Sequence, residues 1–140
     1  MDISCADFGI TPLLYKVAHK CNKVQDECLK KFSISAKQAA ILGVIEFLGD
    51  GAINQKALSE MMGVKESSVS SIVKTMIKNE MISKEQSKTD GRNYILTITR
   101  KGRGICNMIK SSADEFERTF YKNLSDEEKE SLKNLLIKLV

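Results

Sequence analysis

Apolar residues near both ends of the chain recur with the spacing of one helical face. Near the N-terminus the intervals are 3, 4, 3 and 4 residues, at Leu14, Val17, Cys21, Val24 and Cys28. Such a seam suits packing against another helix. We expect Thr11 to cap this helix and Pro12 to stand at its first position, where no N–H is needed. Near the C-terminus, Ser125 and Glu128 predict a capping box ahead of an apolar stripe at Leu132, Leu135, Leu136 and Leu139.

The run from Ala39 to Leu48 is apolar on nearly every side. Such a run predicts a helix that is buried all round, at the centre of the domain. Ser35 and Gln38 form a plausible capping box at its start. Gly49-Asp50-Gly51 then predicts a turn. This turn lacks the spacing and the following lysine of a phosphate-binding loop.

Two further helices are predicted on either side of Gly63. Asn54 can cap the first, Gln55 to Met62, whose inward residues are expected to be Ala57, Leu58, Met61 and Met62. The second, from about Glu66 to Asn79, has one apolar face made of Val69, Ile72, Val73, Met76 and Ile77. Its opposite face carries Ser67, Ser68, Ser70, Ser71, Lys74, Thr75 and Lys78. A short turn with glycine between two helices is typical of a helix-turn-helix.

A β-hairpin is expected next, with strands at 82–86 and 94–99 and a polar loop between them. Thr99 can cap a long helix whose inward set is Ile105, Ile109, Ala113, Phe116 and Phe120. A helix-turn-helix followed at once by a hairpin is a winged helix. The predicted fold class is therefore mainly α with a small β-hairpin (α+β). The two terminal apolar faces can be buried against each other or against a second copy of the chain.

Positive charge is concentrated in the middle of the chain. Lys and Arg outnumber Asp and Glu by ten to five between Asn54 and Arg103, whereas the remainder holds twelve against thirteen. A localised basic region suggests a polyanion as partner. With a winged helix, the expected partner is double-stranded DNA, because the second helix fits the width of the major groove.

The candidate DNA contacts follow from this geometry. Small hydroxyl side chains let the second helix approach closely, while its lysines are expected to meet phosphates. Arg92 near the hairpin tip can enter the minor groove, where negative potential is concentrated. Asp90 is expected to orient the Arg92 guanidinium through a carboxylate pair. The full set is Asn54, Gln55, Lys65, Ser67, Ser68, Ser70, Ser71, Lys74, Thr75, Lys78, Lys84, Lys88, Asp90, Arg92 and Asn93.

These residues carry a family resemblance. DGRNYILTITRKG is similar to the wing signature of the MarR family of winged-helix transcription regulators, and LSEMMGVKESSVSSIVKTM resembles that family's helix-turn-helix. Lys65 and Glu66 stand where many members have a hydroxyl or Asp cap. The resemblance implies one MarR-type domain over 1–140, with dimerisation helices at about 11–32 and 104–140 and a DNA-binding lobe at about 35–103. It also implies a homodimer on a pseudo-palindromic operator, usually acting as a repressor.

The resemblance further implies an input signal. Many MarR relatives respond to small aromatic acids or phenols, and others to cysteine oxidation. The candidate redox residues are Cys5, Cys21 and Cys28. In peroxide-sensing members the reactive cysteine lies a few residues before a stretch like Leu13-Leu14-Tyr15, whereas Cys5 lies ten residues before Tyr15. Cys21 and Cys28 are two helical turns apart and fit equally well as small apolar seam residues.

Other classes of protein fit less well. We find no nucleophile–base constellation, no nucleotide loop and no CxxC, and His19 is a lone histidine, so neither an enzyme nor a bound metal or cofactor is expected. No apolar run reaches membrane-spanning length, and the N-terminus lacks a signal-peptide core, so a cytoplasmic protein without a membrane partner is expected. The competing function is a winged helix used for protein–protein contact, against which Arg92 and the central charge argue.

Overall fold

The fold was obtained as a computed structural model that describes residues 4–140. These residues form six α-helices and one two-stranded sheet. The chain divides into two compact units. The terminal unit joins residues 1–28 to 112–140, and the central unit holds residues 29–111. The predicted fold class, mainly α with a small β-hairpin, is confirmed.

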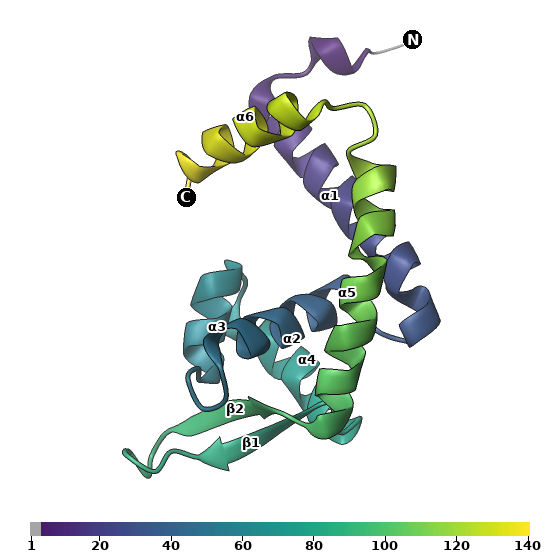
Figure 1. The fold of residues 1–140 in the computed structure, drawn as a ribbon. Coiled ribbons are helices and arrows are strands. Elements are labelled where there is room, and N and C mark those ends of the chain that lie inside the picture. The colour runs from purple at the N-terminus through teal and green to yellow at the C-terminus, as the bar shows by residue number, and fades with distance from the viewer. Residues whose placement is uncertain (1–3) are drawn as a thin grey trace. The chain divides into compact units, whose positions relative to one another are not determined.

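The terminal unit contains the first and last helices of the chain (Figure 1). Its elements are the 3₁₀ turn Cys5–Asp7, most of α1 (Ile10–Leu29), the second half of α5 (Arg100–Phe120) and α6 (Asp126–Ile137). The predicted capping box is present at α6, where the Ser125 hydroxyl accepts from the Glu128 N–H and the Glu128 carboxylate accepts from the Ser125 N–H.

Helix α1 begins earlier than the sequence predicts. Its first helical residue is Ile10, and the Gly9 carbonyl accepts from the Leu13 N–H at 3.4 Å. Thr11 therefore lies inside the first turn and is not the cap. Pro12 is tolerated there because the first N–H groups of a helix have no partner within the helix. The position of Pro12 was thus compatible with more than one first residue for helix α1.

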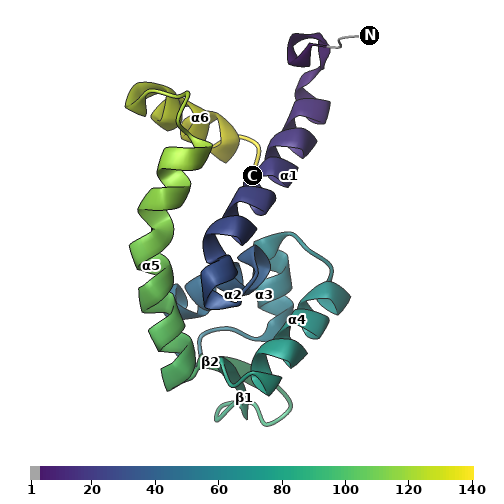
Figure 2. The same ribbon diagram turned by 90° about the vertical axis from the view of Figure 1, so that its right-hand side faces the viewer.

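The central unit is built from three helices and the hairpin, with the first half of α5 beside them (Figure 2). Its elements are the 3₁₀ turn Lys30–Phe32, α2 (Ala36–Leu48), α3 (Gln55–Met62), α4 (Glu66–Lys78), β1 (Ile82–Gln86) and β2 (Tyr94–Ile98). The predicted capping box at Ser35 and Gln38 is present. Gly63, with φ of 64°, ends α3 in the left-handed conformation and lets α4 turn away.

The hydrophobic core of the central unit lies where α2, α3, α4, the sheet and the start of α5 meet. Its largest fully buried side chains are Ile41, Leu42, Ile45, Leu58, Met76, Ile82, Leu96, Val69 and Val73. The inward faces predicted for α4 and β2 supply several of them. This core fixes the outer face of α4 and the hairpin, which are the elements expected to bind DNA.

Three burial predictions were wrong. Helix α2 is buried on one face only, and Phe47 is 87% exposed. Met61 is 58% exposed, since α3 turns Leu58 and Met62 inward instead. On α5, Ala113 is exposed and Ser112 is buried. An apolar residue in a helix does not by itself show which face of the helix is buried, because burial depends on the neighbouring elements in space.

The hairpin joins the core through its inner end. Strands β1 and β2 are antiparallel, with Ile82 opposite Ile98, Lys84 opposite Leu96 and Gln86 opposite Tyr94. The Leu96 N–H also donates to the Ile53 carbonyl at 2.9 Å, which ties the segment before α3 to β2.

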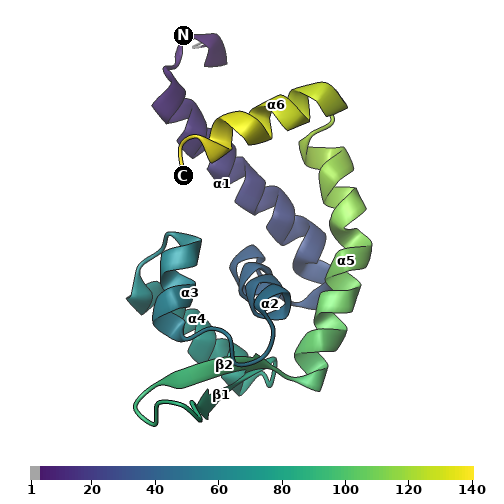
Figure 3. The same cartoon turned by 60° about the vertical axis from the view of Figure 1, so that its left-hand side comes forward.

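The start of α5 is hydrogen-bonded to the segment between α4 and β1. The Thr99 hydroxyl accepts from the Gly102 N–H at 3.0 Å and is also within 2.9 Å of the Met81 carbonyl, to which it can donate. The predicted cap is therefore present. Figure 3 shows the first half of α5 rising from the end of β2 beside α2. Further along, Lys110 is ion-paired with Glu46 of α2 at 3.2 Å.

Candidate nucleic-acid interface

The outward face of α4 is polar and open. Its central residues are Ser67, Ser71, Lys74 and Lys78, all exposed, with Ser68 and Thr75 exposed on one flank and Ser70 half-buried on the other. Lys65 occupies the cap position, yet its side chain makes no capping hydrogen bond. Its carbonyl instead accepts from the Ser68 N–H at 3.0 Å. The helix is thus positioned by burial of its opposite face.

Two hydroxyls on this face are already engaged with the helix itself. Ser71 Oγ donates to the Ser67 carbonyl at 3.3 Å, and Thr75 Oγ1 donates to the Ser71 carbonyl at 3.2 Å. Their lone pairs point outward while their hydrogens are used within α4. In this arrangement both side chains are hydrogen-bond acceptors toward a partner.

The hairpin loop is held by its own polar groups. Asp90 Oδ1 accepts from the Arg92 N–H at 3.1 Å, and Asp90 Oδ2 accepts from Asn93 Nδ2 at 2.8 Å. Ser87 Oγ accepts from the Asp90 N–H at 3.3 Å. The prediction that Asp90 pairs with the Arg92 guanidinium was wrong. Its short side chain reaches the backbone two residues ahead first, as Asp does in turns.

The Arg92 side chain is exposed at the loop, and within residues 4–140 its guanidinium forms no ion pair. The other predicted cations of this region are also exposed and without an ion pair in that part of the chain: Lys65, Lys74, Lys78, Lys84 and Lys88. Exposed cations without an ion pair are available to phosphates without the loss of an existing ion pair.

Asn54 and Gln55 are less available than the sequence suggests. Asn54 is half-buried, and its side-chain oxygen caps α3 by accepting from the Ala57 N–H at 2.8 Å. Gln55 is half-buried at the first position of α3. Both belong to the central unit with α4, but the Asn54 oxygen is already used.

Tyr94 was missed by the sequence analysis. It is 49% exposed at the outer end of β2, and the Lys84 ammonium lies 5.2 Å from the centroid of its ring. The two-residue periodicity of strands could have revealed this pair, since Lys84 and Tyr94 share one face of the hairpin.

The cysteines lie outside this surface, and Cys5, Cys21 and Cys106 are free thiols. Cys5 is exposed, and Lys16 Nζ lies 3.1 Å from its sulfur. Burial raises the pKa of Cys21, which is half-buried on α1. Burial and the nearby Glu46 carboxylate raise the pKa of Cys106. Cys28 is half-buried on α1.

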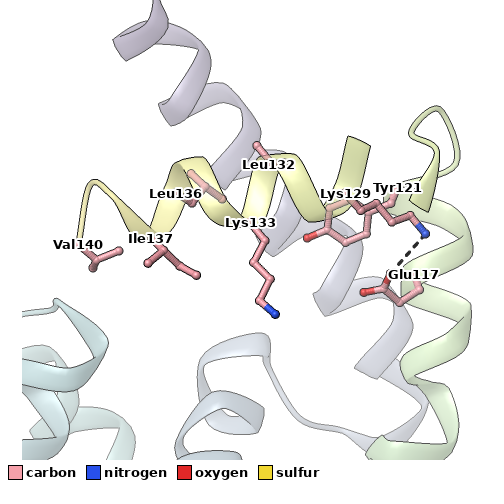
Figure 4. A pocket seen from close by; sticks show the side chains of 8 residues that line it. All are labelled: Glu117, Tyr121, Lys129, Leu132, Lys133, Leu136, Ile137 and Val140. Carbon is pink, nitrogen blue, oxygen red and sulfur yellow. Dashed lines mark ion pairs between the residues drawn. The ribbon is translucent and has the colours of Figure 1, made fainter. Parts of the chain in front are cut away.

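The terminal unit contains a partly open cavity of about 380 Å³ (Figure 4). Most of its wall is apolar and comes from α6, and one end is polar, where Lys129 Nζ lies 3.9 Å from a Glu117 oxygen. Burial raises the pKa of Tyr121, and the neighbouring Cys21 and Glu117 raise it further. The lining residues are Glu117, Tyr121, Lys129, Leu132, Lys133, Leu136, Ile137 and Val140.

In the described part of the chain, no group of three or more His, Cys, Asp or Glu side chains is placed so that it could hold a metal ion. Within residues 4–140, no helix has the length and apolar character needed to cross a membrane.

Comparison with known sequences decides the family. The sequence profile of the family described as Transcriptional regulator SarA/Rot matches residues 23–109, more than half of the chain. The chain belongs to the SarA/Rot family. A curated relative, the HTH-type transcriptional regulator SarZ of Staphylococcus haemolyticus, is 26% identical over 124 residues, which cover 89% of this chain and 82% of SarZ. This SarA/Rot protein is therefore a transcriptional regulator, and its family is not one of enzymes.

Solved structures share the fold of this SarA/Rot chain. A mutant of MarR from E. coli complexed with operator DNA superposes with a TM-score of 0.86 at 20% identity, covering 94% of this chain and 93% of MarR. The S. aureus MepR–DNA complex gives 0.83 at 23% identity, covering 95% and 97%. The predicted resemblance to MarR-family winged helices is confirmed at the level of the fold.

Proposed function

We propose that this SarA/Rot protein is a sequence-specific DNA-binding repressor that binds a pseudo-palindromic operator as a homodimer. In each subunit α4 enters the major groove and the hairpin loop enters the adjacent minor groove. The complex of MarR with operator DNA and the MepR–DNA complex support this proposal, because both proteins share the fold. The exposed hydroxyls and lysines of α4 match the surface of a groove and its phosphates.

The exposed Arg92 guanidinium is the observation on which the proposal mainly rests. Asp90 holds the loop backbone and leaves the Arg92 guanidinium without an ion pair in the described chain. A cation held at the tip of a narrow loop fits the negative potential of a narrow minor groove. A winged-helix module that binds only proteins does not need a cation at this position.

Homodimerisation is supported by the exposed apolar side chains of the terminal unit. On α6, Leu135 and Leu139 are exposed, and on α1, Leu14 and Val17 are exposed. We propose that residues 11–32 and 104–140 supply the dimer helices and that residues 35–103 form the DNA-binding lobe. Two copies of α4 related by a two-fold axis would read two half-sites roughly 34 Å apart.

The candidate contacts to DNA are the residues predicted from the sequence. Those on the outer face of α4 and in the hairpin loop are the best exposed. Asn54 and Gln55 would contribute only at the edge, because both are half-buried.

A small aromatic acid or phenol is the proposed effector. The cavity beside α6 has the volume of a small-molecule site, with apolar walls for a ring and an ammonium, that of Lys133, for a carboxylate. Binding there would act on the helices proposed to form the dimer.

Cysteine oxidation is the second candidate signal, and one contact favours it. The exposed sulfur of Cys5 lies beside the Lys16 ammonium, the electropositive and accessible surrounding typical of reactive cysteines. Cys21 and Cys28 are less accessible, being half-buried.

The deciding experiment is selection of bound sequences from random duplex DNA, followed by titration of the selected site. We expect a two-fold symmetric site, and we expect Arg92→Ala to weaken its binding by about 1–3 kcal/mol. Arg118→Ala is the matched control, because it removes an exposed arginine of the terminal unit, and ultracentrifugation checks that this variant remains dimeric. Titrations with salicylate and with peroxide compare the two candidate signals.

Failure to recover any duplex would overturn DNA binding and favour the protein–protein module. Wild-type affinity of Arg92→Ala for the selected site would overturn the minor-groove assignment alone.

A further inference from the structure

One face of the hairpin changes character along its length. Because strand side chains alternate between faces, Ile82, Lys84 and Gln86 of β1 share a face with Ile98, Leu96 and Tyr94 of β2. The inner positions of this face are buried in the core, and the outer positions, Lys84, Gln86 and Tyr94, are exposed. The outer end is therefore a continuation of the core-facing side that has no core to cover it.

Lys84 and Tyr94 are diagonal neighbours on this outer end, since Tyr94 lies two residues before the direct partner of Lys84. The Lys84 ammonium lies 5.2 Å from the centroid of the Tyr94 ring, within the range of a cation–π contact. The Gln86 side-chain amide donates to the Gly91 carbonyl and so is occupied by the loop. A lysine side chain is mobile on its own, and the ring restricts where its ammonium lies.

The Tyr94 hydroxyl forms no hydrogen bond within residues 4–140, and the Lys84 ammonium forms no ion pair there. An exposed O–H donor is therefore carried by the same ring that the Lys84 ammonium contacts. Phosphate oxygens accept from both kinds of donor, and such charge-assisted bonds are the stronger ones.

We propose that Tyr94 and Lys84 together bind one phosphate of the DNA backbone at the outer end of the hairpin. The Tyr94 O–H contacts the phosphate directly, and the Tyr94 ring positions the Lys84 ammonium for the same group. Tyr94 is thereby assigned a role in DNA binding that does not depend on base sequence. This inference rests on the proposed function and adds a contact between the two grooves.

The test measures affinity for the selected duplex as a function of salt in four variants. Tyr94→Phe keeps the ring and removes the donor, so we expect affinity to fall about 3- to 10-fold with an unchanged salt slope. Lys84→Ala should make the negative slope of log K against log salt shallower by about 0.9. Tyr94→Leu should lose more affinity than Tyr94→Phe and also reduce the slope, because the ammonium is no longer held.

The fourth variant combines Lys84→Ala with Tyr94→Leu. Without the ammonium the ring has nothing to position, so in this background Tyr94→Leu should cost only what Tyr94→Phe costs in the wild type. Phe47→Leu is the matched control, because it removes another exposed aromatic ring, from α2, outside the candidate DNA contacts and the proposed dimer helices. Thermal unfolding of each variant checks that the hairpin is intact.

Wild-type affinity in both Tyr94 variants would overturn the proposal, as would independent, multiplying losses for Tyr94→Leu and Lys84→Ala. If the wild-type protein binds no duplex, the proposed function itself fails, and this outcome is distinct because it is seen before any variant is made. Because Tyr94→Phe conserves the ring, it remains informative even if Tyr94→Leu unfolds the hairpin.

Discussion

Among the glycines, Gly102 has the least space for a side chain. A Cβ atom placed on it would lie 2.0 Å from the Met81 carbonyl oxygen, far inside any real contact. The Gly102 N–H is also bonded to the Thr99 hydroxyl, so the first turn of α5 cannot shift without loss of its cap. This close approach gives a physical reason for the glycine at the end of the wing signature.

We therefore expect Gly102→Ala to destabilise the central unit by about 1–3 kcal/mol, the usual cost of overpacking a filled site. Gly104→Ala is the matched control two residues later, since a Cβ there meets nothing within 4 Å. In a helix interior, alanine is favoured over glycine by roughly 0.5–1 kcal/mol, so this variant should be slightly more stable. Urea unfolding midpoints compare the two, and equal midpoints would contradict the close approach.

The partner predicted for the Asp90 carboxylate, the Arg92 guanidinium, was wrong. The sequence places Asp90 and Arg92 in one short loop, and an ion pair was the simplest expectation. Local backbone N–H groups compete for the same carboxylate and lie nearer. The contact set of a loop depends on its backbone conformation, which composition alone does not specify.

At the scale of elements, α4 followed its pattern closely. Its apolar residues recur with helical spacing, and a hydrophobic core was available on that side, so its buried and exposed faces could both be predicted. The burial of helix α2 did not match the prediction. Its residues are apolar on nearly every side, so their pattern holds no information about which side is covered.

The exposed face of α4 leads to a prediction about Lys74 and Lys78. If each contacts a phosphate, replacing either with alanine should weaken binding to all duplexes and reduce the salt slope by about one unit. Lys37→Ala is the control, since Lys37 is exposed on α2 and lies outside both the candidate DNA contacts and the proposed dimer helices. The measurement is affinity at several salt concentrations, and an unchanged slope would remove that lysine from the phosphate contacts.

At the scale of the whole molecule, the apolar stripe of α6 remains uncovered in a single chain. Leu135 and Leu139 are largely exposed, although a stripe with this spacing is usually buried. Patches of this kind mark interaction sites, and a second copy of the chain is the proposed partner.

We expect Leu135→Glu to convert the protein to monomers and to weaken binding to a two-fold symmetric site. Burying a carboxylate in an apolar interface without a partner is strongly unfavourable. Asn134→Glu adds the same charge to the opposite side of α6 and should remain dimeric. Analytical ultracentrifugation at micromolar concentration gives the measurement, and a wild-type monomer there would contradict the dimer.

The sequence by itself determined the local features of this protein. The capping boxes at Ser35 and Ser125 and the glycine that ends α3 depend on residues within a few positions of one another, and the hairpin joins two strands that are consecutive in the chain. Such contacts form whenever the chain adopts the element, so their residues can be recognised directly. The winged-helix order follows from these features in series.

Only the tertiary structure decided the features that join distant parts of the chain. These are the uncovered face of α2, the contact of Gly102 with Met81, and the extension of the hairpin beyond the core that leaves Tyr94 exposed beside Lys84. Each depends on which surfaces meet in space. Burial and close contact depend on which residues are adjacent in space, and the pattern of residues along the chain does not specify these neighbours.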